Sequence, residues 1–395
     1  MMLNQDIVRE ATRLTRAGQL VEATALLERM LQGGIAPTPD WRSATQAQLP
    51  RCDPLTIDAT ADVVEERKAP QIAPARSGQG LRPSLLRDGM RDVSGLRLRS
   101  PIARAPLSPS DIVPEGTRFI AGQFSNVAGS RTYKLFIPSR YQEQRLPLIV
   151  MLHGCTQSPD DFAAGTRMNF LAEEQNCLVA YPEQPSGANQ SKCWNWFRTS
   201  DQRRGGGEPS IIAGITRQIM RDHVIDPKRV YVAGLSAGGA AAAIMGATYS
   251  DLYAAVGIHS GLACGAASDL SSAFIAMRQG GGSRAIADIS VPTIVFHGDR
   301  DTTVHPNNGD QIIEQSASAT RSTRKVLRGR VPHGHSYTRT ILIDGAGRAI
   351  SEHWNIDGAG HAWSGGSPAG SYTDPQGPDA TREILRFFLE HSLSG

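Results

Sequence analysis

The sequence predicts an α/β fold in which a mostly parallel sheet has helices on both faces. Two observations lead to this prediction. Short apolar runs rich in β-branched residues alternate along the chain with longer segments of helical composition. Residues 229–243 also pass from an apolar run, through a glycine-rich turn, directly into a row of alanines, which is the order strand, tight turn and helix. Such alternation is typical of a parallel sheet wrapped on both sides.

The expected elements begin near residue 117 and end near residue 391. A leading antiparallel pair of strands is expected at residues 117–124 and 131–138. Apolar or alternating runs predict four more strands, at residues 146–152, 178–181, 291–296 and 350–356. Helices are expected at residues 210–223, 237–249 and 381–391.

Composition and charge limit the class of protein. With 395 residues, 40% of them apolar, the chain can bury one large core. A net charge of +3 is too small to indicate a nucleic-acid partner. The first residues lack a basic start followed by an unbroken apolar run, so we expect neither a signal peptide nor a membrane span, and a cytoplasmic location is the default. An odd number of cysteines without C-x-x-C spacing favours reduced thiols, which agrees with that location; they are Cys52, Cys155, Cys177, Cys193 and Cys264.

The chain divides into three expected parts. Residues 1–32 have the apolar spacing of an amphipathic helical segment interrupted at Ala17-Gly18. Its simpler interpretation is docking on the main domain or self-association, and its sharper one is contact with a hydrophobic surface. Residues 33–113 form a linker rich in Pro and Arg that we expect to be largely disordered, with a basic stretch that is solvated or meets an acidic partner. Residues 114–395 form the α/β domain.

One serine stands at the apex of the strand, turn and helix at residues 229–243. The turn reads Gly-Leu-Ser-Ala-Gly-Gly over residues 234–239 and contains Ser236. A serine hydroxyl becomes a good nucleophile when a strained turn holds it exposed beside a base and near a helix N-terminus. Glycine fits at 234 and 238 because a side chain there would clash with the neighbouring strand or helix. The alternative is an ordinary structural turn between two elements.

An acid and a base are expected further along the chain. The strand at 291–296 leads into a loop with two carboxylates, Asp299 and Asp301. Asp301 is favoured because it lies deeper in the loop and precedes Val304, which can pack the loop down, whereas Asp299 suits a turn after glycine. His361 is the favoured base because it lies in a glycine-rich loop beyond the last strand, beside Trp363.

The other histidines that we considered have simpler interpretations. His353 lies within the alternating strand and is expected to be a packed or surface side chain. His333 and His335 would make a weak metal site, since no cysteine or carboxylate lies nearby in sequence, and a solvated loop is favoured. His153 and His297 each precede a glycine at a strand end and are expected to hydrogen-bond loop backbone.

A site for a developing oxyanion is expected after the strand at 146–152. That strand ends in His-Gly-Cys-Thr-Gln over residues 153–157. The backbone N–H of Cys155, with that of Thr156 as second choice, would join the N–H of Ala237 as donors. Cys155 is less suited to act as a thiol nucleophile, because no separate acid and base pattern points to it.

Five ordered motifs together resemble the polyhydroxybutyrate depolymerase family of esterases. They are His-Gly-Cys-Thr-Gln (153–157), Tyr-Pro-Glu-Gln (181–184), Cys-Trp-Asn-Trp-Phe (193–197), Gly-Leu-Ser-Ala-Gly-Gly (234–239) and Gly-His-Ala-Trp-Ser-Gly-Gly (360–366). The resemblance spans about residues 116–392. It implies an α/β-hydrolase fold, a Ser236, Asp301 and His361 triad, and Cys155 with Ala237 as oxyanion donors. It also implies short-chain polyhydroxyalkanoates, or their oligomers, as substrates.

No cofactor and no metal are implied. Three tryptophans are expected to line the crevice, Trp194, Trp196 and Trp363.

Feruloyl and acetyl-xylan esterases share much of the pattern, so an esterase of that type or a general short-chain carboxylesterase is the alternative. A peptidase of similar fold is less favoured, because such peptidases usually add a large gating domain and no segment of this sequence has that length. From another class, the chain would be a granule-associated binding protein whose N-terminal helices carry the function. Secreted relatives of the family carry disulfides, which would argue against a cytoplasmic location.

Overall fold

The computed structural model describes residues 60–62, 107–281, 291–317 and 322–393. The expected helical segment at 1–32, nearly all of the expected linker, and Cys52 lie outside these residues. Within the described residues, no helix is long and apolar enough to cross a membrane.

The centre of the molecule is an 11-stranded sheet, in the order β1-β9-β10-β11-β8-β7-β6-β4-β5-β3-β2. Its six central strands, from β11 to β5, are parallel, while both edges are antiparallel. The strands are β1 Thr60–Asp62, β2 Arg118–Asn126, β3 Gly129–Ile137, β4 Leu146–Leu152, β5 Leu178–Pro182, β6 Ile225–Leu235, β7 Ala255–His259, β8 Thr293–Gly298, β9 Thr323–Arg330, β10 Ser336–Ile343 and β11 Ala349–Ile356; a separate small sheet pairs β12 Trp363–Ser364 with β13 Thr373–Asp374.

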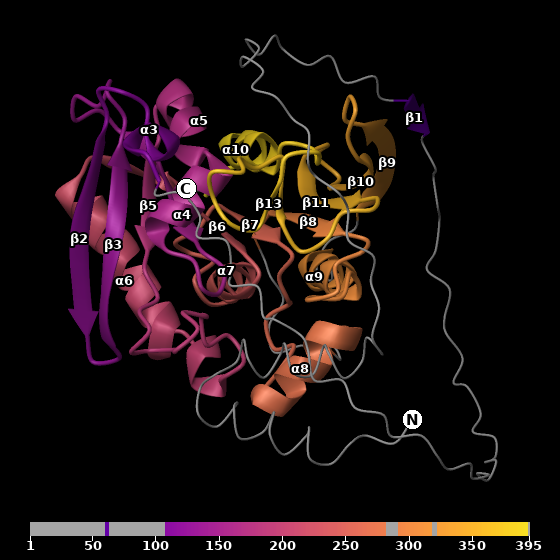
Figure 1. Cartoon of the computed structure of the whole chain (residues 1–395), viewed down its shortest axis with the longest axis horizontal. Helices are drawn as coiled ribbons and strands as arrows, with labels where there is room; N and C mark the ends of the chain where they lie inside the picture. Colours follow the sequence, from indigo (N-terminus) through magenta and orange to yellow (C-terminus); the bar gives the residue numbers. More distant parts are fainter. Residues whose placement is uncertain (1–59, 63–106, 282–290, 318–321, 394–395) are drawn as a thin grey trace, which may run out of the picture.

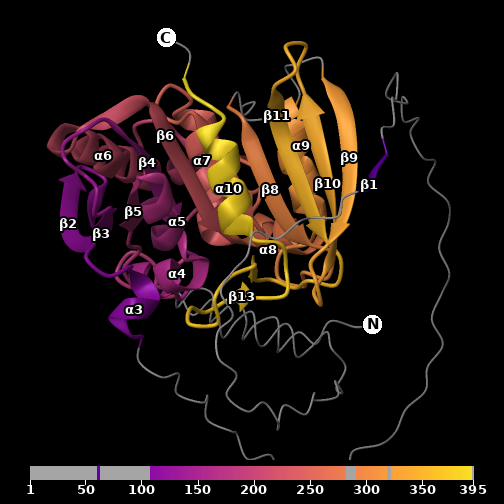
Figure 2. The same ribbon diagram turned by 90° about the horizontal axis from the view of Figure 1, so that it is seen from above.

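Helices cover both faces of the sheet (Figures 1 and 2). Helices α4 Pro159–Thr166, α5 Met168–Gln175 and α10 Ala380–Leu389 pack on one face. Helices α6 Gly207–Asp222, α7 Ala237–Thr248 and α9 Asn307–Ala317 pack on the other, and α8 Leu270–Gln279 packs against α9. Two short elements complete the list, α3 Pro109–Ile112 and the 3-10 helix η1 Thr199–Gln202.

Alternation along β4 shows how one strand supplies two cores. All seven of its residues are buried. Leu148, Val150 and Leu152 join the core under α6 and α7, whereas Ile149 and Met151 join the core under α5 and α10. Because successive side chains of a strand point to opposite faces, a continuous apolar run is what a strand covered on both sides requires.

A buried carboxylate fastens the last helix to the sheet. Glu352 in β11 is 1% exposed, and its carboxylate accepts hydrogen bonds from Arg339 of β10 at 2.7 Å and from Arg386 of α10 at 2.8 Å. The Trp354 indole donates to the same carboxylate at 3.1 Å. Two guanidinium groups thus compensate the cost of burying this charge.

The predicted α/β fold with a parallel centre and helices on both faces is confirmed. The predicted leading pair corresponds to β2 and β3, and the other predicted strands and helices correspond to β4, β5, β6, β8, β11, α6, α7 and α10. Sequence reasoning did not predict β7, the β9–β10 hairpin or helices α4, α5, α8 and α9. His333 lies in the turn of that hairpin with a φ of 57°, and His335 pairs with Asp374 at 2.9 Å.

The chain packs onto the α/β domain slightly before residue 114. Ile112 and Val113 contact the core under α5 and α10, and the Asn169 amide donates to the carbonyl of Ile112 at 2.9 Å. Strand β1, within the segment expected to be a linker, pairs antiparallel with β9. The division of the chain at residues 32 and 113 stays a prediction.

Candidate active site

Ser236 lies on a sharp turn between β6 and α7. Its φ of 57° is on the left-handed side, which is strained for a residue with a side chain. The turn is held because the Ser236 N–H donates to the carbonyl of His259, at the end of β7, at 2.9 Å. Strain of this kind persists only where the surrounding structure imposes it. The side chain is thereby directed out of the sheet, at the start of a helix.

Two glycines allow this turn to lie close to β4. A Cβ on Gly238 would overlap the carbonyl oxygen of Leu152, and a Cβ on Gly234 would overlap the carbonyl of Gly238. Backbone, rather than a flexible side chain, blocks both positions, so neither clash can be relieved by a rotamer change. The glycine pattern that suggested the turn therefore has the steric basis expected for it.

His361 and Asp301 come together from two loops. The Nδ1–H of His361 donates to Oδ2 of Asp301 at 2.7 Å. Asp301 follows β8, and His361 lies beyond β11, the parallel neighbour of β8 in the sheet. Neighbouring parallel strands end at the same edge of a sheet, so their loops meet there.

The Asp301 carboxylate lies in a network of donors. Its Oδ1 accepts backbone N–H bonds from Thr303 at 2.9 Å and Val304 at 2.8 Å. The Nε2 of His297 lies 3.5 Å from Oδ2 and donates to the Val304 carbonyl at 2.7 Å. Burial by itself would raise the pKa of Asp301, but interactions with His297 and His361 outweigh it and lower that pKa. The carboxylate is therefore ionised and can fix the orientation of the His361 ring.

Asp299 performs a different task in the same loop. Its Oδ1 accepts the N–H of Gly358 at 2.6 Å, and its backbone N–H donates to the Ile356 carbonyl at 3.0 Å. These bonds join the β8 loop to the start of the loop that carries His361. The turn-forming interpretation of Asp299 agrees with this geometry, and the structure brings Asp301, not Asp299, to the imidazole.

Both proposed oxyanion donors lie beside Ser236. Gly154, Cys155 and Ala237 line the same cavity as the serine. The N–H of Thr156 instead donates to the Ser191 carbonyl at 2.7 Å, which removes the second-choice donor. Cys155 with Ala237 remains the predicted pair.

Gln157 shapes the loop that carries Cys155, a role that sequence reasoning did not assign. Its Oε1 accepts the Gly154 N–H at 2.9 Å, and its Nε2 donates to Asp161 at 2.9 Å and to the Ser371 carbonyl at 3.1 Å. One side chain therefore ties the loop after β4 to the loop before β13. The glutamine at the end of the His-Gly-Cys-Thr-Gln motif was the available signal.

The expectation of reduced thiols is wrong for two cysteines. Cys155 and Cys193 form a disulfide, whereas Cys177 and Cys264 are buried free thiols. The pairing of Cys155 with Cys193 could not be predicted from the sequence, because 38 residues separate them and only the folded loops bring them together. The bond links the proposed oxyanion loop directly to the Cys-Trp-Asn-Trp-Phe loop.

A buried carboxylate holds this second loop in place. Glu208, at the start of α6, accepts the Asn195 backbone N–H at 2.7 Å and its side-chain amide at 2.6 Å. Gln184 donates to the same carboxylate at 2.6 Å, and Arg131 lies 3.4 Å from it. Burial raises the pKa of Glu208, and the hydrogen bonds from Asn195 and Gln184 oppose that rise.

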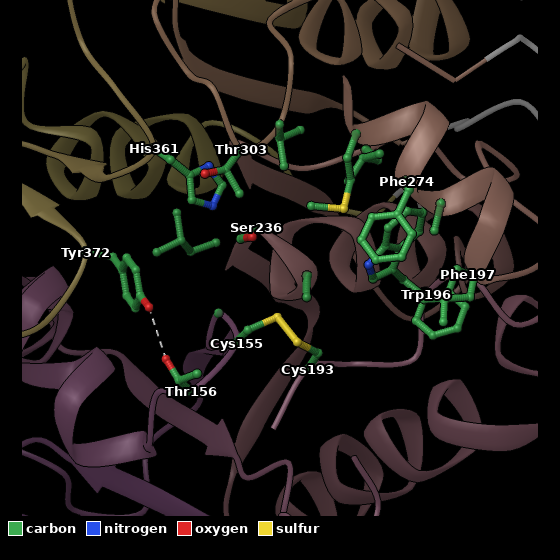
Figure 3. Close-up of a pocket in the computed structure, with 18 residues that line it drawn as sticks. Cys155, Thr156, Cys193, Trp196, Phe197, Ser236, Phe274, Thr303, His361 and Tyr372 are labelled. Carbon is green, nitrogen blue, oxygen red and sulfur yellow. Dashed lines mark hydrogen bonds between the residues drawn. A yellow bond between two sulfur atoms is a disulfide. The ribbon is translucent and has the colours of Figure 1, made fainter. Parts of the chain in front are cut away.

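The cavity has a volume of about 340 Å³ and an uneven lining (Figure 3). Ser236 lies between two groups of side chains: Trp196, Phe197 and Phe274 lie on one side, and His361 and Tyr372 lie on the other. Helix α8 adds Leu270, Ala273 and Met277 to the apolar wall. A pocket that is mostly apolar, with a few convergent polar groups, is the usual form of a small-molecule site.

Of the three tryptophans expected at the crevice, Trp196 lines the cavity, and the expectation is corrected for the other two. Trp194 and Trp363 are each 1% exposed. The Trp194 indole N–H donates to the His153 carbonyl at 3.1 Å, and that of Trp363 donates to Thr381 at 2.8 Å. Both rings pack under the loops of the site and not on its surface. Each can be buried because its N–H has a hydrogen-bond partner.

Two buried histidines support these loops as neutral rings. Burial lowers the pKa of His153 to about 4, and burial together with the nearby His297 and His361 lowers that of His259 to about 3. His153 donates to the Gly154 carbonyl at 2.7 Å and accepts the Gln184 N–H at 3.1 Å. His259 accepts the Ser364 N–H at 3.0 Å. The backbone-bonding task expected for His153 and His297 agrees with these contacts.

Comparison with known proteins identifies the family of this domain. Residues 131–326 match the family model described as Esterase PHB depolymerase. The chain carries a domain of this esterase family. Poly(3-hydroxyalkanoate) depolymerase C of Paucimonas lemoignei is 36% identical over 233 residues, covering 54% of each chain. Probable acetylxylan esterase A of Aspergillus clavatus is 29% identical over 189 residues, covering 43% of this chain and 60% of that protein. The chain thus spans little more than half the length of these two relatives.

The fold of the esterase domain also has a solved counterpart. The acetyl xylan esterase from Aspergillus awamori aligns with a TM-score of 0.52 over 69% of this chain and 99% of that chain, at 18% sequence identity. This likeness supports the α/β-hydrolase fold. The structure brings Ser236, Asp301 and His361 to one site, and their catalytic roles stay predictions.

The two carboxylates of the β8 loop can be separated by substitution. Asp301→Asn should lower kcat by about 10⁴, because an amide no longer favours the required tautomer of His361. Asp299→Asn is the matched control and should lower kcat much less, since it weakens only the bond to Gly358. Steady-state hydrolysis of a soluble ester would measure both. The larger loss in Asp299→Asn would transfer the role to that residue.

The disulfide can be tested against a buried free thiol. Cys193→Ala should lower the free energy of unfolding by about 2–4 kcal/mol and also lower kcat, because the Cys155 loop loses a covalent restraint. Cys177→Ala, which removes a buried thiol that does not line the cavity, should leave kcat within about twofold. Urea unfolding and initial rates give both quantities. An unchanged kcat in Cys193→Ala would show that the disulfide does not position the donor.

Proposed function

We propose that the protein is a serine esterase that works through an acyl-enzyme intermediate. Ser236 attacks the ester carbonyl carbon while His361 takes the hydroxyl proton, and the N–H groups of Cys155 and Ala237 receive the developing oxyanion. Collapse of the intermediate breaks the bond to the alcohol oxygen, which takes the proton from His361. Water then attacks the acyl-enzyme by the same route and releases the acid. Asp301 holds the imidazole and stabilises its charged form.

One observation carries the proposal. Ser236 and His361 line the same cavity, and the Nδ1–H of His361 donates to the ionised Asp301 carboxylate, which orients the ring. A structural glycine turn would require none of these partners. The family of the domain supports the same chemistry.

The cavity lining favours an aliphatic polyester over a carbohydrate ester. Among the residues that the structure describes, the polar side chains that line it, apart from Ser236 and His361, are Thr156, Thr303, Tyr372 and the indole of Trp196. A sugar ring would bring several hydroxyl groups that need partners, and unpaired polar groups are costly on binding. A hydroxybutyrate unit brings one carbonyl with methyl and methylene groups. We therefore propose short-chain polyhydroxyalkanoates or their oligomers as substrates, as the name of the Paucimonas relative also suggests.

An acetyl-xylan or feruloyl type of esterase is the second candidate. The names of several relatives, including the Aspergillus clavatus protein, favour the acetyl-xylan type, and a feruloyl esterase or a general short-chain carboxylesterase would share the same machinery. Substrate choice among these classes depends on the walls of the cavity and not on the proposed triad.

Location and recruitment are proposals of a different kind. The cytoplasmic location expected from the sequence stays a prediction, and the Cys155–Cys193 disulfide counts against it, since such bonds persist mainly in oxidising compartments. We propose that residues 1–32 bring the enzyme to a polymer granule or mediate self-association. This rests on their amphipathic spacing alone.

A substrate panel tests the function. Wild-type protein should hydrolyse amorphous polyhydroxybutyrate and its dimer and trimer with a higher kcat/KM than acetyl-xylan or feruloyl esters, because the cavity has few partners for sugar hydroxyls. Ser236→Ala should lose about 10⁴ to 10⁶ in kcat on every ester while remaining folded. Acid release and circular dichroism measure these outcomes. Activity of Ser236→Ala within about tenfold of wild type would reject the mechanism, and preference for acetyl-xylan would reject the substrate.

Truncation tests the N-terminal segment. Removing residues 1–106 should preserve turnover of a small soluble ester, because every residue of the proposed site lies beyond residue 150. Co-sedimentation with polymer granules and polymer hydrolysis should fall if residues 1–32 recruit the enzyme. Equal losses on the soluble ester and the polymer would instead mean that the removed segment supports the folded domain.

A further inference from the structure

Two hydroxyl groups face each other at the edge of the cavity. Oγ1 of Thr156 and the phenolic oxygen of Tyr372 are 3.2 Å apart, and they come from the loop after β4 and the loop before β13 (Figure 3). Both residues line the cavity that contains Ser236. Tyr372 is 47% exposed, so core packing does not account for its position.

Both residues also have an unfavourable backbone conformation. The φ of Thr156 is 67° and that of Tyr372 is 53°, in a region that favours glycine. Side chains in this region are uncommon and cluster at functional sites, where surrounding contacts impose them. Two such residues, from two different loops of one cavity and with their hydroxyls in contact, are evidence that does not depend on the pocket lining.

The loop that carries Tyr372 is anchored beside it. The Ser371 N–H donates to Asp161 at 2.9 Å, the Ser371 hydroxyl also donates to that carboxylate, and Gln157 donates to the Ser371 carbonyl at 3.1 Å. The Tyr372 carbonyl accepts a hydrogen bond from the backbone N–H of Trp363 at 2.7 Å. Since Gln157 also holds the Gly154 N–H, the phenol is fixed relative to the proposed oxyanion loop. The hydroxyl pair is thus preorganised.

The side of the cavity decides which part of a substrate meets this pair. His361 must deliver its proton to the alcohol oxygen that leaves, so the alcohol part lies on the His361 side of Ser236. Tyr372 lies on that side, whereas Trp196, Phe197 and Phe274 lie on the opposite one. Two hydroxyls that share one mutual hydrogen bond keep one hydrogen to donate. The alcohol side therefore offers a donor, and the opposite side offers apolar surface for the acyl chain.

We propose that Tyr372, oriented by Thr156, binds the carbonyl oxygen of the next ester or carboxyl group in the alcohol part of the substrate. This inference rests on the proposed esterase function and adds an alcohol-side subsite to it. A hydroxyacid oligomer carries such a carbonyl a few bonds from the leaving oxygen, and a simple alkyl ester does not. Tyr372 is then a residue that selects oligoesters of hydroxyacids over plain esters with the same acyl group.

Two esters with one acyl group test the subsite. The methyl ester of β-butyryloxybutyrate has a second carbonyl in its alcohol part, and sec-hexyl butyrate has a chain of similar length without it. The quantity to measure is the ratio of kcat/KM for butyrate release from the first ester to that from the second. Tyr372→Phe keeps the ring and removes the donor, so we expect this ratio to fall about three- to tenfold, the effect of one hydrogen bond. Tyr133→Phe, which removes a phenolic hydroxyl from β3 outside the cavity, is the matched control.

The outcomes separate this inference from the proposed function. A fall of the ratio in Tyr372→Phe but not in Tyr133→Phe supports the subsite. An unchanged ratio in Tyr372→Phe, or an equal fall in both variants, overturns it, even though both esters are still cleaved. If wild-type protein cleaves neither ester, or if Ser236→Ala cleaves them equally well, the proposed function fails first and the subsite fails with it. Equal thermal unfolding midpoints of the two variants ensure that the ratio reports binding and not loss of fold.

Discussion

Close backbone contact between the serine turn and the end of β4 is the constraint on which the site depends. Gly238 and Gly234 permit it, because a side chain at either position would meet a carbonyl oxygen of the neighbouring backbone. The contact brings the start of α7 next to the loop at residues 153–157. Ala237 and Cys155 thereby face the same cavity, although 82 residues separate them in the sequence. A larger separation between turn and strand would move one proposed donor away from the other.

Hydrogen bonds and a disulfide between neighbouring loops hold the residues of the site together. Asp299 ties the β8 loop to the His361 loop, Gln157 ties the β4 loop to the Tyr372 loop, and the disulfide ties the β4 loop to the Trp196 loop. Most of these contacts are buried or half-buried, where a hydrogen bond is less exposed to competition from water. The loops carry the chemistry, and the sheet supplies only their starting points.

The sequence was informative wherever a local pattern has one structural solution. Apolar runs predicted β4 and β8, alternation predicted β11, and the glycine spacing predicted the turn at Ser236. It was uninformative about contacts between distant loops. Nothing local distinguishes Trp196, which faces the cavity, from Trp194, whose indole bonds a buried carbonyl.

Other features depended on tertiary context in the same way. Cys155 and Cys193 pair only because two loops meet, so cysteine spacing could not reveal the bond. The β9–β10 hairpin was missed because its strands carry many basic and half-buried residues, as suits antiparallel strands near the edge of a sheet. Gln157 bonds to Gly154, Asp161 and Ser371, and only the folded loops bring these groups to one side chain.

The ion pair beneath helix α10 limits where the protein can be shortened or fused. Arg386 of α10 neutralises Glu352, which lies in the strand that leads to His361. Without α10, that buried carboxylate would depend on Arg339 alone, and the side of the sheet under the helix would open to water. The carboxyl-terminal helix is therefore part of the foundation of the site and not a removable tail. A protease that cut just before residue 380 would loosen the strand that leads to His361 without touching a residue of the cavity.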